Sequence, residues 1–189
     1  MSGTPLLAII VVVVVLIVIA LVATSIGRYR RSKALRRRFG PEYDRAVSER
    51  PSRRAAERDL QQRERRHAEL SLRDLEPRQR QRYADQWERT QAHFVEEPEA
   101  ATREADALVT QVMAERGYPV DDFDTRVQDL SVEHSETLGH YRDAHEINKV
   151  NERGQASTEQ LRQALMHYRV LFADLLGDRP GGRTAAGHG

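Results

Sequence analysis

The chain has 189 residues and no cysteine, and 31% of its residues are charged while only 6% are aromatic. The absence of cysteine excludes disulfides, thiolate catalysis and cysteine-ligated zinc or iron–sulfur sites. A composition rich in charge and poor in aromatic residues favours exposed helices over a β-sandwich or a β-barrel.

The first predicted element is a membrane-spanning helix within residues 1–27. Leu6 to Ile26 is a run of 21 uncharged residues, mostly Val, Ile and Leu. About 20 helical residues cross a hydrocarbon core of about 30 Å. A cleaved signal peptide is the alternative, because small residues occur near the end of the run. However, no basic residue precedes Leu6. We therefore expect a retained anchor.

A basic segment follows at residues 28–40. Seven of the 30 basic residues lie here, which leaves 23 against 29 acidic residues and a net charge of −6 elsewhere. Basic residues beside a span stay in the cytoplasm and attract anionic lipid headgroups. We therefore predict an inner (plasma) membrane protein with a cytoplasmic C-terminal domain and no nucleic-acid partner; an exported cell-surface domain is the alternative. The predicted membrane-surface residues are Arg28, Arg30, Arg31, Lys33, Arg36, Arg37 and Arg38.

Residues 41–76 are predicted to form a charged helical linker. Phe39-Gly40-Pro41 separates it from the basic segment, and few apolar residues interrupt the charges between Arg53 and Arg73. This pattern is typical of a solvated helix, or of a stalk. A coiled coil is an alternative, but its apolar heptad positions are not sustained.

Residues 77–176 are predicted to form a small helical bundle. Pro77 and Pro98 each suit the first position of a helix, and Gly117 suits a helix C-cap. Tyr83, Trp87 and Phe94 have the spacing of one helix face. The predicted fold class is therefore all-α, with one N-terminal transmembrane helix, a charged linker helix and a small helical bundle.

Three further helices are expected before a disordered tail at 177–189. A short one lies around Phe123, and one capped by Ser131 would place His134, Leu138, Tyr141 and His145 on one face. The last begins with a Ser157/Gln160 capping box and ends at Gly177. Their apolar stripes predict packing into one core.

Histidine and tyrosine side chains provide the ligand candidates, which are His134, Tyr141, His145, His167 and Tyr168. A face lined by imidazoles, phenols and arginines could bind an anion or sense pH. The alternative is that these residues only pack the helices. The histidine spacing does not suit a metal shared on one helix. We predict no catalytic residue, no metal and no cofactor.

Several short motifs resemble those of a family of uncharacterised bacterial proteins, frequent in high-GC genomes of the actinobacterial type. The matching pieces are Phe39-Gly40-Pro41-Glu42-Tyr43-Asp44, Trp87–Pro98, Arg116-Gly117-Tyr118-Pro119, Leu130–His134, Ser157-Thr158-Glu159 and His167-Tyr168-Arg169. The resemblance implies a bacterial protein that often carries a membrane segment. It brings no known activity, catalytic residue or cofactor.

The combined pattern predicts a membrane-anchored, non-enzymatic interaction or scaffold module. It would contact the lipid bilayer and an unidentified protein partner, and self-association into a homo-oligomer stays open. The alternatives are small-ligand or pH sensing through the His/Tyr/Arg face, and an enzyme of unfamiliar type.

Overall fold

The computed structural model describes the backbone of residues 3–177 and the side chains of residues 16–27 and 29–177. Eight helices make up the secondary structure of this part of the chain, and it contains no strand. The predicted all-α class is therefore confirmed. Residues 178–189 of the predicted tail lie outside the described residues.

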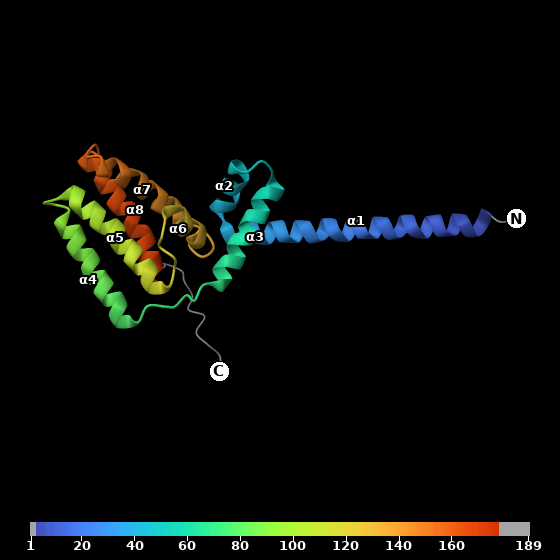
Figure 1. The fold of residues 1–189 in the computed structure, drawn as a ribbon, viewed down its shortest axis with the longest axis horizontal. Helices are drawn as coiled ribbons and strands as arrows, with labels where there is room; N and C mark the ends of the chain where they lie inside the picture. Colours follow the sequence, from blue (N-terminus) through green and yellow to red (C-terminus); the bar gives the residue numbers. More distant parts are fainter. Residues whose placement is uncertain (1–2, 178–189) are drawn as a thin grey trace.

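The longest helix, α1 (Gly3–Phe39), projects from the rest of the molecule (Figure 1). It continues without a break through the uncharged run and the basic segment. Residues 6–15 of the predicted span lie outside the described side chains. Over the residues that are described, no helix combines the length and the apolar character needed to cross a bilayer. The predicted membrane span is therefore not confirmed.

Two helices pack beside the end of α1. They are α2 (Pro41–Glu49) and α3 (Arg53–Glu69). Gly40 joins α1 to α2 with a φ of 47°, a left-handed value that glycine adopts without a Cβ penalty. We call the end of α1, α2 and α3 the three-helix unit.

The three-helix unit has a small core of its own. Phe39 and Leu60 are fully buried in it, together with Leu35, Tyr43, Ala46, Ala56 and Val132. The helix predicted in the charged stretch is thus present as α3, but its Ala56/Leu60 face is buried rather than solvated. Two apolar residues one turn apart suffice because α1, α2 and Val132 supply the rest of the cluster.

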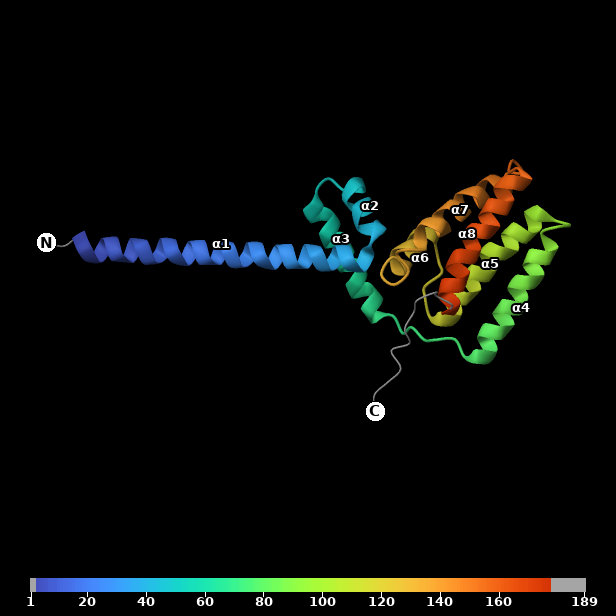
Figure 2. The same ribbon diagram turned by 180° about the vertical axis from the view of Figure 1, so that it is seen from behind.

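The second part of the molecule, α4 to α8, is the bundle. Figures 1 and 2 show α4 (Pro77–His93), α5 (Pro98–Arg116), α8 (Thr158–Leu176) and α7 (Leu138–Glu152) lying side by side in that order. The short α6 (Phe123–Leu130) lies next to α7 and faces α3. Trp87 stacks on Phe172 with 4.7 Å between ring centroids, within a large apolar cluster.

Most of the predicted helix ends in the bundle are confirmed. Pro77 and Pro98 each open a helix, and Ser157 with Gln160 forms the capping box of α8. Gly117 ends α5 with a φ of 93°, and a Cβ there would lie 2.6 Å from the Ser71 carbonyl oxygen. Glycine is required at this position for both reasons.

One predicted helix is shorter than expected. Ser131 does not cap it, because residues 131–137 form turns and α7 begins only at Leu138. His134 therefore does not share a helix face with Tyr141 and His145. Its side chain turns instead towards α8, where its Nδ1 lies 2.7 Å from an Asp174 carboxylate oxygen. This long-range contact outweighs the local helical pattern.

Candidate functional site: an arginine-lined groove between α1 and α3

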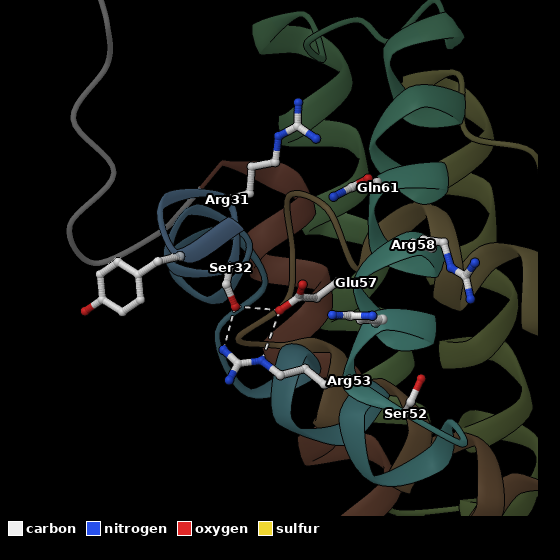
Figure 3. Close-up of a pocket in the computed structure, with 9 residues that line it drawn as sticks. Arg31, Ser32, Ser52, Arg53, Glu57, Arg58 and Gln61 are labelled. Atoms are coloured by element: carbon white, nitrogen blue, oxygen red, sulfur yellow. Dashed lines mark hydrogen bonds and ion pairs between the residues drawn. The ribbon is translucent and has the colours of Figure 1, made fainter. Parts of the chain in front are cut away.

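A groove of about 680 Å³ lies between α1 and α3 (Figure 3). Two stretches of chain at least 20 residues apart form it: the α1 segment just after the uncharged run, and the first half of α3. We call it the arginine groove. Its lining residues are Tyr29, Arg31, Ser32, Ser52, Arg53, Arg54, Glu57, Arg58 and Gln61.

The charge of the arginine groove is strongly positive. Among the described side chains, four arginines and one glutamate line it, which gives a net charge of +3. Arg31, Arg54 and Arg58 are exposed. None of these three forms an ion pair or hydrogen bond with another residue that the structure describes. Their guanidinium groups are therefore available to a ligand.

The fourth arginine is held in a hydrogen-bond network at the side of the groove. Arg53 donates from Nη2 to Ser32 Oγ at 2.5 Å and from Nε to Tyr43 Oη at 2.8 Å. Glu57 Oε1 accepts from Ser32 at 2.5 Å and from Tyr43 at 2.7 Å. Through Tyr43, this network joins all three helices of the three-helix unit. Figure 3 shows its Ser32, Arg53 and Glu57 members at the side of the groove.

The network also sets the charge of Glu57. Partial burial favours its neutral form, but hydrogen bonds from Ser32, Tyr43 and Arg53 outweigh burial and hold the pKa of Glu57 below its ordinary value. Hydrogen bonds to Tyr43 and Glu57 raise the pKa of Arg53. Glu57 is therefore ionised and its charge is offset by Arg53. The other three arginines set the field of the groove.

The predicted membrane-surface residues have different environments. Arg36 pairs with Asp44 at 2.7 Å and Arg38 with Glu64 at 3.5 Å. Among those whose side chains are described, Arg31 alone lines the groove. Three others are exposed with no described partner, namely Arg30, Lys33 and Arg37. The side chain of Arg28 lies outside the described residues.

The predicted His/Tyr ligand candidates do not converge on one pocket. Tyr141 and Tyr168 are fully buried in the bundle, with 6.3 Å between their ring centroids. Burial raises the pKa of both phenols. His145 stacks on Phe123, with 3.7 Å between ring centroids. These three residues therefore pack the bundle.

Two other candidates make specific polar contacts elsewhere. His134 is buried beside Asp174, and Thr137 donates to the same carboxylate at 2.7 Å. His167 on α8 meets His140 on α7, with their Nδ1 atoms 2.8 Å apart. For this contact to be a hydrogen bond, one of these nitrogens donates and the other accepts. No group of three or more His, Asp or Glu side chains is arranged to hold a metal among the described residues.

The α3 residues of the groove were not among the site residues predicted from the sequence. Arg54, Arg58 and Gln61 have i, i+4, i+7 spacing and so share one helix face, which was a usable signal. Their proximity to Arg31 was not readable from the sequence, because it depends on how α3 folds back on α1.

No protein-family model, no curated protein and no solved structure matches this chain. The resemblance to a high-GC bacterial family thus stays a prediction.

Proposed function

We propose that the chain is a single-pass membrane protein held at the cytoplasmic face of the plasma membrane. Its three-helix unit and bundle, together called the head, form a non-enzymatic interaction module. The apolar run supports the span, since 21 uncharged residues rising about 1.5 Å each match a hydrocarbon core of about 30 Å. The seven basic residues that follow support the direction, because such a cluster resists translocation.

The observation that carries the proposal is the continuity of α1. The helix runs from the apolar residues to Phe39 without a break, and Phe39 is fully buried in the core of the three-helix unit. An anchor of this kind is a rigid helical connection rather than a flexible linker. It fixes the height and orientation of the head against the bilayer, which suits a module that presents surfaces to partners at the membrane.

The remaining charge supports the same arrangement. Outside the basic segment, the sequence carries a net charge of −6. An anionic leaflet repels such a domain while it attracts the basic segment. The basic segment would then lie at the membrane surface. The bundle would lie farther from the lipid, exposed to a protein partner or to a second copy of the chain.

A topology experiment tests this proposal. The full chain is expressed with a reporter after Leu176, in one version active only in the cytoplasm and in the other only in the periplasm. We expect retention in the membrane after alkaline carbonate washing and activity of the cytoplasmic reporter alone. Recovery in the soluble fraction, or activity of the periplasmic reporter, would refute it.

A matched variant tests the cause of the orientation. Replacing Arg30, Arg31, Lys33 and Arg37 with Gln removes four charges that have no described ion-pair partner. We expect mixed orientation, with the periplasmic reporter now active in part of the population. An unchanged orientation would show that these charges do not set the direction.

A further inference from the structure

We propose that the arginine groove binds the phosphate of an anionic phospholipid headgroup, through Arg31 on α1 and Arg54 and Arg58 on α3. This inference rests on the proposed membrane anchor and goes beyond it. The basic segment alone would give diffuse attraction to negative lipids. The groove adds a shaped site in which one headgroup sits between two helices.

The depth of the groove fits a headgroup. Arg31 is five residues beyond Ile26, the last residue of the uncharged run. At about 1.5 Å per residue, it lies about 8 Å past the hydrocarbon edge, and the headgroup layer of one leaflet is about 5–8 Å thick. Tyr29, at the rim of the groove, is exposed. Tyrosine is enriched at this depth because its ring is apolar and its hydroxyl polar.

The side chains suit a phosphate. Guanidinium groups bind phosphate oxygens through paired, charge-assisted hydrogen bonds. Three arginines in the groove have no described partner, whereas Arg36 and Arg38 on the same α1 segment are paired with acidic residues. Glu57, whose carboxylate lines the groove, is already neutralised by Arg53. A phosphate entering the groove therefore meets uncompensated positive charge.

The start of α3 adds to the attraction. Ser52 and Arg53, its N-cap and first residue, both line the groove. The N-terminus of a helix carries a partial positive charge from its aligned peptide dipoles. This contribution supports the arginines and has the same sign.

A lipid fits better than a soluble phosphate compound. One wall of the groove is α1 itself, immediately after its apolar run, so a phosphate in the groove lies beside a helix that continues into the hydrocarbon layer. Acyl chains attached to that phosphate would run along the apolar residues of α1. A soluble ligand would leave that continuation unused.

Two arginine variants on one helix test the site. Arg54→Gln/Arg58→Gln removes two groove charges that are not part of the basic segment. Arg65→Gln, also exposed on α3 and without a described partner, changes charge on the same helix outside the groove. All these side chains are exposed, so the variants should fold, which thermal melts by circular dichroism verify.

The measurement is lipid retention by the full chain. The protein is purified in neutral detergent with equal amounts of phosphatidylglycerol and phosphatidylcholine, and native mass spectrometry counts the lipids bound. We expect the wild type and Arg65→Gln to retain phosphatidylglycerol preferentially. The groove variant should lose this preference by roughly 10- to 30-fold, since each basic residue near the surface contributes about 1 kcal/mol.

Three results would overturn the inference. An equal loss in Arg65→Gln would show attraction by general charge, and an unchanged preference in the groove variant would remove the site. Displacement of the lipid by an equal concentration of inorganic phosphate would indicate a soluble ligand. Failure of the anchor is seen separately in the carbonate wash, because a chain retained in membranes without a lipid preference contradicts this inference alone.

Discussion

The three-helix unit and the bundle are built on different balances of apolar and polar contacts. The bundle core includes 21 buried apolar residues from five helices and the segments next to them. The three-helix unit has seven, and one of these, Val132, comes from the turn after α6. The part nearest the proposed membrane is therefore the one with the thinner core, and the bundle completes it.

Polar contacts with the bundle partly compensate for the smaller apolar core of the three-helix unit. Arg142 on α7 forms a two-pronged ion pair with Glu42 on α2. Arg66 on α3 donates to Gln128 on α6 at 2.5 Å. A cluster of seven apolar residues is too small to hold a unit on its own. We infer that the bundle supplies most of the free energy of unfolding. The three-helix unit contributes less and has a more charged surface.

The largest expected effect is in the bundle core. Trp87→Ala removes the ring that stacks on Phe172 and leaves a cavity, which should cost about 3–5 kcal/mol of unfolding free energy. Chemical denaturation of the detergent-solubilised full chain measures it. Trp87→Phe is the control, since it keeps a stacking ring, and it should cost clearly less. Equal losses in the two variants would show that the stack does not matter.

A smaller, local effect is expected in the three-helix unit. Leu60→Ala empties the centre of the smaller core and should cost about 2–5 kcal/mol there. Because the bundle has its own core, amide hydrogen exchange should accelerate in α2 and α3 and stay nearly unchanged in α8. Equal acceleration in α8 would mean that the two parts unfold as one unit.

The ion pair between the two parts should contribute less. Glu42→Gln leaves Arg142 without its charged partner and should cost about 1.5–3 kcal/mol, the range for hydrogen bonds to charged groups. Glu49→Gln is a matched control on the same helix, because its partner Arg45 is exposed. Thermal melts compare the two. If Glu49→Gln were equally destabilising, the ion pair would have no special role.

The smallest effect is a pH dependence in the bundle. Burial lowers the pKa of His145, so the unfolded chain takes up this proton first as the pH falls. The contribution of neutral His145 to the free energy of unfolding is fully present above about pH 6.5. It is lost as the pH falls towards the lowered pKa.

His145→Phe keeps a ring against Phe123 and removes the titration. The drop in melting temperature between about pH 7 and about pH 5 should therefore be smaller in the variant than in the wild type. The comparison cancels contributions from the other histidines. An identical drop in both proteins would contradict the assignment.

Local signals in the sequence predicted the bundle well. Pro77, Pro98, Gly117 and the Ser157/Gln160 capping box act on their immediate neighbours, so the chain itself carries their information. His134 and the buried face of α3 were harder to predict. Each is decided by a contact with a residue more than 15 positions away, such as Asp174 for His134.

The candidate site shows the same division. Its α1 half was visible as a run of basic residues, and Arg31 was among the predicted membrane-surface residues. Its α3 half appeared only as charges on an expected solvated helix. The arginine groove exists because Phe39 and Leu60 bury together and bring the two halves side by side.

The most direct test of the central claim is the depth of the groove in a bilayer. The chain has no cysteine, so Arg54→Cys and Gln163→Cys each introduce a single site for a spin label. In vesicles, collisions with oxygen and with a water-soluble nickel chelate report depth. We expect headgroup depth for a label at position 54 and bulk water for one at position 163, on α8. Equal exposure to water at both positions would contradict it.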